Sequence, residues 1–261
     1  NQIYATGVLT LMNQVTFPVL DKRVIIFAGA YGSGKTEVAV NYAAGLAATC
    51  SEPVSIIDLD VINPYFRSRE AALSLVAQGV RVISPHGEMC HADLPIILPE
   101  IRGEIERSEG KVVLDVGGDN VGARVLSSLA DSFGRGYEFL IVLNARRPFT
   151  STVTGSLKMI HDIEISSRLK FTGIISNTHL IDETTTETVE EGYRLACAVS
   201  TEAGLPVKFV SAVGEAAKRL DPETIGVPVF TLKRQLLKPW EEKDRAARSS
   251  KNKGGLVLCR V

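Results

Sequence analysis

A glycine-rich octapeptide constrains the fold of this chain more than any other feature. Residues 29–36, called the phosphate loop below, read Gly-Ala-Tyr-Gly-Ser-Gly-Lys-Thr and match the pattern G-x-x-x-x-G-K-[ST]. Residues 24–28 before the loop are all apolar, which is typical of a buried parallel strand, and residues 37–48 after it predict a helix. Strand, loop and helix in this order predict a phosphate-binding turn at the edge of a parallel sheet.

The residue types in the phosphate loop suit a di- or triphosphate. Glycines let backbone N–H groups approach phosphate oxygens without a Cβ clash, and the helix that follows adds free N–H groups and its positive dipole end. Lys35 would reach the β- and γ-phosphates, and the Thr36 hydroxyl would bind Mg²⁺. A chance match is the alternative, and the flanking elements argue against it. The expected nucleotide contacts in the loop are Gly29, Gly32, Ser33, Gly34, Lys35 and Thr36.

Apolar runs alternate with helical patterns along the rest of the chain. We expect strands at residues 54–59, 80–83, 112–116, 139–143, 171–176 and 207–210, and helices at 67–77, 98–107, 121–133, 152–165 and 184–203. This alternation predicts an α/β fold, in which a mostly parallel sheet is covered by helices on both faces. We expect an N-terminal extension (1–21), one nucleotide-binding domain (22–232), and a charged C-terminal helix with a short final strand (233–261).

Carboxylates follow two of the expected strands. Asp58 and Asp60 lie two residues apart on an extended chain, so their side chains would point the same way. They suit an outer-shell contact to Mg²⁺ and the orientation of an attacking water, although acids here can also cap a helix or start a turn. Asp115 ends the other strand and would hold Mg²⁺ or its water. Gly117 and Gly118 would let the chain turn close to the γ-phosphate, where a backbone N–H could sense it.

Asn177 follows a late strand, where it could hydrogen-bond the base of a nucleotide or start an Asx turn. The base motif N-K-x-D of GTPases is absent, since Thr178 replaces its Lys and Leu180 replaces its Asp. This substitution favours adenine, and therefore ATP, over guanine. Isolated histidines such as His161 and His179 are interpreted as surface or capping residues.

Composition excludes several classes of function. The net charge of −1 gives no electrostatic case for nucleic acid or an anionic membrane. No apolar stretch approaches the roughly 20 residues that span a bilayer, so we expect no membrane anchor. No signal-peptide pattern is seen, and the four cysteines have no C-x-x-C spacing, which fits a reducing cytoplasm.

Residues 29–36, 58–63, 115–118 and Asn177 together resemble the MinD/ParA-type branch of P-loop NTPases, which includes CooC-like and cobyrinate-synthase-like domains. The resemblance covers roughly residues 22–230. It implies the three-layer P-loop NTPase fold and an ATP- and Mg²⁺-dependent switch in which ATP reorganises two loops and often a dimer. It also implies that Asp60 orients the hydrolytic water and that Asn177 contacts adenine.

One residue departs from that branch. Most of its members have a second lysine directly after the first glycine of the loop, which reaches the nucleotide of the partner subunit, whereas this chain has Ala30. An arginine could substitute, because guanidinium suits developing phosphoryl charge, although for any single candidate a surface salt bridge is the favoured interpretation. The candidates are Arg67, Arg69, Arg146 and Arg147. The C-x-C pair of nickel-inserting members is also missing.

The loop at residues 84–93 contains two His, one Cys and two acids, and it could bind a metal, meet a partner or cover the site.

Three functions stay open for the chain. The first is an ATP-driven switch or assembly factor for a partner protein such as a metalloenzyme. The second is a small-molecule kinase or a dethiobiotin-synthetase-like ligase, a branch in which many members lack the second lysine. The third is a non-catalytic scaffold, against which the intact Lys35, Thr36, Asp60 and Asp115 argue.

Overall fold

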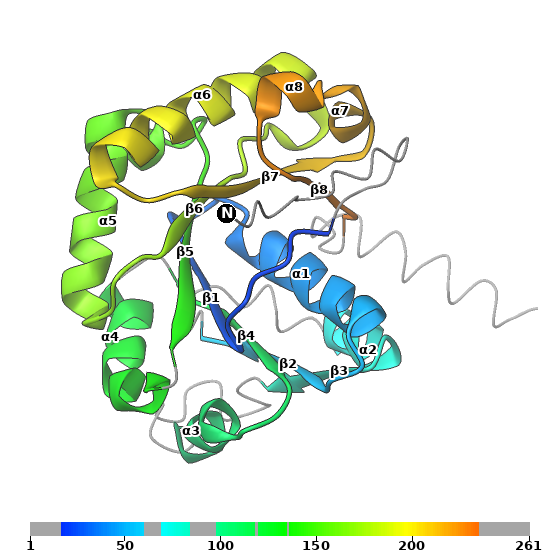
Figure 1. The fold of residues 1–261 in the computed structure, drawn as a ribbon, viewed down its shortest axis with the longest axis vertical. Helices are drawn as coiled ribbons and strands as arrows, with labels where there is room; N and C mark the ends of the chain where they lie inside the picture. The colour runs from blue at the N-terminus through cyan, green and yellow to red at the C-terminus, as the bar shows by residue number, and fades with distance from the viewer. Residues whose placement is uncertain (1–16, 60–68, 84–97, 118–119, 135, 235–261) are drawn as a thin grey trace, which may run out of the picture.

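The computed structural model describes residues 17–59, 69–83, 98–117, 120–134 and 136–234. These residues build one eight-stranded sheet in the order β3-β2-β4-β1-β5-β6-β7-β8, with every neighbouring pair parallel (Figure 1). The strands are β1 (Val24–Ala28), β2 (Val54–Asp58), β3 (Val80–Ile83), β4 (Lys111–Asp115), β5 (Tyr137–Leu143), β6 (Gly173–Ser176), β7 (Val207–Val213) and β8 (Val229–Leu232). The expected parallel α/β fold is confirmed.

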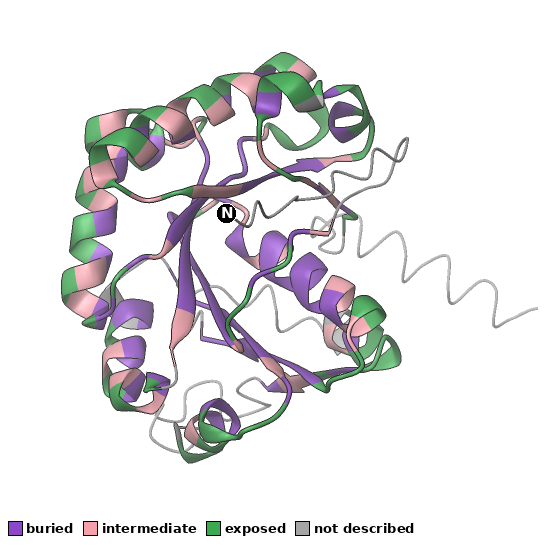
Figure 2. Cartoon of the chain, viewed as in Figure 1, coloured by how far each residue is buried: buried purple, intermediate pink, exposed green. Residues whose placement is uncertain are grey.

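Helices cover both faces of the sheet and make a three-layer structure. They are α1 (Lys35–Thr49), α2 (Arg69–Ala77), α3 (Leu98–Glu106), α4 (Asn120–Leu129), α5 (Val153–Ser167), α6 (Thr186–Ala203), α7 (Gly214–Arg219) and α8 (Pro222–Ile225). One core cluster joins α1 and α2 to the sheet, and the cluster on the opposite face joins α3, α4, α5 and α6 to it. Figure 2 shows the buried strands between helices whose outer surfaces are exposed.

The position of β1 explains its continuous apolar sequence. All five of its residues are buried, because β4 and β5 flank it and helices cover both of its faces. Ile25 and Phe27 pack on the α1 side, whereas Val24, Ile26 and Ala28 pack on the other side. A strand with two buried faces needs apolar residues at consecutive positions rather than at alternate ones. The strands expected at residues 24–28 and 80–83 are confirmed to the residue.

Several boundaries differ from the expectations. The helix after the phosphate loop begins at Lys35 rather than at residue 37, and Gly34, in the left-handed conformation, is its N-cap. The helix expected at 121–133 ends at Leu129 and continues as a 3₁₀ turn, Ala130–Phe133. The sequence-based expectations omit β8, an edge strand with only alternate residues buried. The tail helix and final strand expected beyond residue 234 lie outside the described residues.

The first and the last described segments of the chain, around Phe17 and Lys233, pack against the middle of α1. The ring of Phe17 stacks on Tyr42 with centroids 4.9 Å apart, and the Tyr42 hydroxyl donates to the Pro18 carbonyl at 3.0 Å. At the other end, the Asn41 side chain donates to the Lys233 carbonyl at 2.9 Å and accepts from the Lys233 N–H at 2.8 Å. The helix that starts at the phosphate loop is therefore held at mid-length by segments that flank the expected domain.

Candidate functional site

The phosphate loop turns between the carboxyl end of β1 and the first residue of α1 in a conformation that depends on its glycines. Gly32 and Gly34 have φ of 74° and 83°, in the left-handed region that favours glycine. Gly29 lies so close to the neighbouring strand that an added Cβ would be 2.5 Å from the Val142 carbonyl oxygen. The sequence places glycine where the backbone bends or where another strand leaves no space for a side chain.

The residues after the last glycine open α1. Lys35 is buried and Thr36 is half-buried in the first turn, where the free N–H groups and positive dipole end of the helix attract anions. Within the loop, the Ser33 hydroxyl is buried and has no hydrogen-bond partner among the described residues. A phosphate-binding loop would supply such donors, so these residues fit a polyphosphate.

Asp58 and Asp115 lie side by side at the carboxyl ends of β2 and β4, where they are partners in the parallel register. Their exposed fractions are 3% and 0%. Side chains alternate between the faces of a strand, and Ile56 and Val113, two residues earlier, both pack in the α1 cluster. The two carboxylates therefore lie on the α1 side of the sheet.

A Mg²⁺ ion at this place would find ligands of the right kind. The Thr36 hydroxyl and the carboxylates of Asp58 and Asp115 are oxygen donors, which Mg²⁺ prefers, and an ion bound by few protein ligands keeps waters and phosphate oxygens as the others. The donor set fits the expected metal.

Several expected site residues lie outside the described part of the structure. These are Asp60, the expected water-orienting residue, Gly118, Arg67 and the loop at 84–93. Arg69 begins α2, and its side chain is also outside the described part. Their roles stay predictions.

Asn177 is buried behind the phosphate loop and links it to two strands. Its Nδ2 donates to the Ser33 carbonyl at 2.7 Å, and its Oδ1 accepts from the Ser211 hydroxyl at 2.9 Å. Its backbone N–H donates to the Leu143 carbonyl at 2.8 Å. Asn177 therefore holds the loop in place, and its expected contact with adenine stays a prediction. The sequence reading did not single out Ser211, because a serine inside a strand carries no motif.

His179 and Arg147 lie against the glycines of the loop. A Cβ added to Gly34 would be 3.0 Å from His179 Nε2, and the Arg147 Nε donates to the Gly32 carbonyl at 2.7 Å. Burial, and to a lesser extent the charge of Arg147, lowers the pKa of His179 from 6.5 to about 4. The imidazole is therefore neutral at pH 7, and Arg147 supplies the positive charge on this side of the loop.

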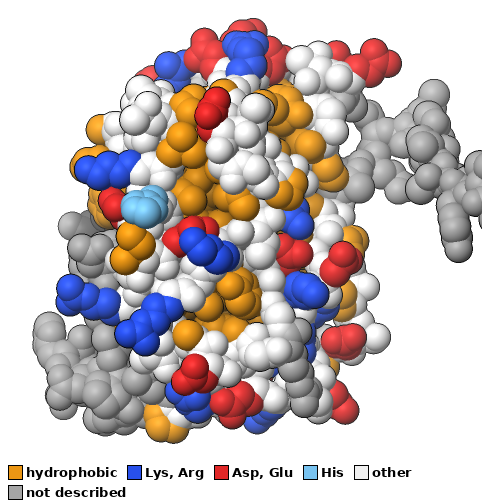
Figure 3. Space-filling model, turned by 60° about the vertical axis from the view of Figure 1, so that its left-hand side comes forward, with side chains coloured by type: hydrophobic (Ala, Val, Ile, Leu, Met, Phe, Trp, Pro, Cys, Tyr) orange, Lys and Arg blue, Asp and Glu red, His pale blue; other side chains and the backbone are white. Residues whose placement is uncertain are grey.

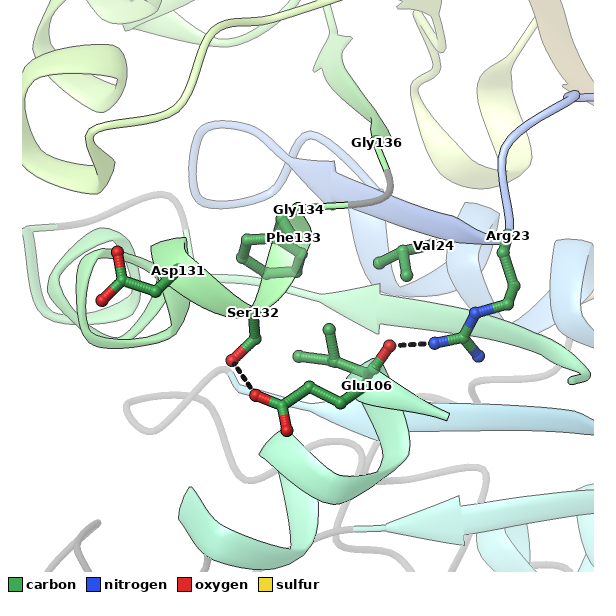
Figure 4. A pocket seen from close by; sticks show the side chains of 9 residues that line it. Arg23, Val24, Glu106, Asp131, Ser132, Phe133, Gly134 and Gly136 are labelled. Carbon is green, nitrogen blue, oxygen red and sulfur yellow. Dashed lines mark hydrogen bonds between the residues drawn. The ribbon is translucent and has the colours of Figure 1, made fainter. Parts of the chain in front are cut away.

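A cavity of about 250 Å³ lies at the opposite end of the sheet (Figure 4). Arg23, at the start of β1, donates there to the carbonyls of Glu104 and Glu109 at 3.2 and 3.3 Å, and Glu106 accepts from the Ser132 hydroxyl at 3.0 Å. These contacts tie the end of α3 to neighbouring segments. They account for the polar lining as structural, and the amino ends of parallel strands are not where such sheets bind ligands.

The face of the molecule drawn in Figure 3 carries charges of both signs. Figure 3 shows Lys and Arg side chains interspersed with Asp and Glu, with hydrophobic side chains gathered between them. None of the described helices combines the length and the hydrophobicity that a membrane crossing requires.

Comparisons with known proteins identify the fold. No protein-family model and no curated protein sequence matches the chain. Among solved structures, chloroplast FtsY from Physcomitrella patens is similar with a TM-score of 0.51 and 16% identity over 81% of this chain, and the match spans just under two thirds (66%) of that protein. FtsY from Thermotoga maritima is similar with a TM-score of 0.51 and 21% identity, over 82% of this chain and 71% of that one. With its phosphate loop seated between β1 and α1 at the centre of an all-parallel sheet, the chain has the three-layer fold of the P-loop NTPases.

Proposed function

We propose that the chain binds ATP with Mg²⁺ and hydrolyses it as a nucleotide switch of the MinD/ParA type, acting as an assembly or maturation factor for a partner protein. One observation carries the proposal. The buried Asp58 and Asp115 lie on the α1 side of the sheet, and Lys35 and Thr36 of the phosphate loop form the start of α1. A lysine, a hydroxyl and two carboxylates around a glycine loop are what phosphoryl chemistry with a metal requires.

ATP is proposed over GTP on the residues after β6. Thr178 and Leu180 stand where a guanine-reading N-K-x-D motif would have Lys and Asp. Thr178 is buried, and its hydroxyl accepts from the Ala145 N–H at 2.9 Å, so it serves the loop after β5.

The partner protein and a homodimer are proposed on the MinD/ParA resemblance, and a cytoplasmic location is proposed on the scattered cysteines. A small-molecule kinase or ligase is the second candidate, and Ala30 favours it. Position 30 is an alanine, so the phosphate loop has no lysine there to offer to a second subunit.

Nucleotide binding tests the first step. We expect the wild-type protein to bind a fluorescent ATP analogue in Mg²⁺, with excess ATP displacing it more effectively than GTP. Lys35→Ala should weaken binding by about tenfold or more, since a charge-assisted contact to phosphate is lost. Lys218→Ala is the matched control, because Lys218 is an exposed lysine on α7 that pairs with Glu215. Equal affinity of wild type and Lys35→Ala would refute the phosphate-loop assignment, and stronger displacement by GTP would refute the choice of ATP.

Turnover then separates the two candidates. A switch should hydrolyse ATP slowly and accelerate when its partner protein is added. A kinase or ligase should consume ATP at an ordinary rate only with a small-molecule acceptor and should convert that acceptor. Asp60→Ala should abolish hydrolysis while leaving ATP binding intact, and hydrolysis at the wild-type rate would refute the role of Asp60.

A further inference from the structure

Arg147 lies directly against the phosphate loop. It follows β5, the strand that flanks β1, and its Nε donates to the Gly32 carbonyl at 2.7 Å. The guanidinium covers Gly32 closely, since a Cβ added there would lie 2.9 Å from Nε and 3.1 Å from Cζ. Of the two candidate arginines whose side chains the structure describes, Arg146 and Arg147, it is Arg147 that touches the loop.

The segment that carries Arg147 is braced from several sides. Its N–H donates to the Asn144 carbonyl at 3.1 Å, and its own carbonyl accepts from the Thr150 N–H at 3.0 Å. The Thr150 hydroxyl also donates to the Asn144 carbonyl, at 2.8 Å, and the Ala145 N–H donates to the Thr178 hydroxyl. Asn144, Thr150 and Thr178 are all buried. A side chain on such a segment starts from a fixed position, which lowers the cost of using it in binding.

Arg147 and its neighbour Arg146 differ in whether their charge has an ion-pair partner among the described residues. Arg146 pairs with Glu191 on α6 at the surface. Arg147 has no ion-pair partner among the described residues, and its bond to Gly32 uses one of five guanidinium N–H donors. The charge of Arg147 also acts on His179 beside the loop, where it is the second cause, smaller than burial, of the lowered pKa of that imidazole. A half-buried cation beside a phosphate loop, with donors to spare, suits a polyphosphate oxygen.

We propose that Arg147 contacts the polyphosphate of the bound nucleotide from within the same chain and does the work for which Ala30 provides no lysine. This inference rests on the proposed nucleotide function. Its guanidinium would offset negative charge that grows on the phosphates during hydrolysis. The consequence is that the rate per molecule does not depend on a lysine donated by a second copy.

The test compares Arg147→Ala, Arg147→Lys and the control Arg146→Ala in the full chain. Affinities for ATP and for adenosine are measured separately in Mg²⁺, together with the ATP turnover number. For Arg147→Ala we expect ATP affinity to fall by about tenfold and turnover by about 10- to 100-fold, with adenosine affinity unchanged. Arg147→Lys should recover part of the turnover because it keeps the charge, and Arg146→Ala should behave as the wild type.

Each other outcome overturns the inference in a recognisable way. Wild-type ATP affinity and turnover in Arg147→Ala would show that the arginine has no role in catalysis, while the proposed function stands. An equal loss of ATP and adenosine affinity, with no recovery in Arg147→Lys, would show that Arg147 only supports the loop. If the wild-type rate per molecule rises with protein concentration and Arg147→Ala leaves it unchanged, the charge comes from a second copy. If the wild type binds no nucleotide, the proposed function itself fails.

Discussion

Replacing Asn177 by Ala tests whether this side chain holds the phosphate loop or reads the base. Its amide makes two buried hydrogen bonds, to the Ser33 carbonyl at 2.7 Å and from the Ser211 hydroxyl at 2.9 Å. Each bond contributes about 1 kcal/mol net, and a buried carbonyl left without a partner adds a cost of about 1–2 kcal/mol. The Ser211 hydroxyl keeps an alternative acceptor, the Ser176 carbonyl at 3.4 Å. We therefore expect Asn177→Ala to lower the free energy of unfolding by about 3–4 kcal/mol.

Equilibrium urea unfolding measures this loss, and a double-mutant cycle assigns it. Ser211→Ala removes one of the two bonds and leaves the buried Asn177 Oδ1 without this donor, so it should cost about 2–3 kcal/mol. The double variant should be less destabilised than the sum of the single ones, since both remove the same bond. Asn177→Ala should also lower the affinities for ATP and for inosine triphosphate by the same factor, because the loop that binds their common phosphates loosens. Unchanged urea stability, with a loss of affinity confined to ATP, would refute the holding role and support a base contact.

Two further predictions concern the surroundings of the loop. Gly29→Ala should destabilise the protein by about 1–3 kcal/mol and weaken nucleotide binding, because its methyl group would lie 2.5 Å from the Val142 carbonyl oxygen. Gly103→Ala in α3, where nothing lies within 4 Å, is its control and should stabilise the protein by about 0.5–1 kcal/mol in thermal unfolding; similar melting temperatures for the two variants would contradict this. The pKa of His179 is lowered from 6.5 to about 4, so the unfolded chain takes up this proton first and stability should fall as the pH drops from about 6.5 to 4. The loss is at most about 3 kcal/mol, and His179→Gln should remove that part of the pH dependence; an unaltered pH profile in this variant would disprove the assignment.

The sequence predicted the parts of the site that depend on local patterns. The phosphate loop follows from its motif, and the common side of Asp58 and Asp115 follows from strand periodicity once the strands are parallel neighbours. The contacts of Arg147 and Ser211 could not be predicted in this way. They require β5 to lie beside β1 and β7 beside β6, and hydrophobic periodicity does not specify the lateral order of strands.

The same limit applies to the meaning of individual residues. Asn177 follows a strand in a way that suits a base contact, an Asx turn or a support for the loop. Only the placement of Ser33 on one side and Ser211 on the other shows that both polar ends of its amide are used for support. A polar residue after a strand is thus a good marker of the site and a poor marker of its own role.

The packing of Phe17 and Lys233 on α1 matters to anyone who shortens this protein. A fragment cut at residues 22 and 232 would delete the ring that stacks on Tyr42, the Pro18 carbonyl that its hydroxyl uses, and the backbone groups that Asn41 binds. The helix that presents Lys35 would then lose support where it packs next to β8, since Phe17 and Tyr42 both contact Phe230 of that strand. Poor nucleotide binding by such a fragment would then reflect the loss of these contacts to α1. The roles of the catalytic residues should therefore be tested in fragments that run at least from residue 17 to residue 234.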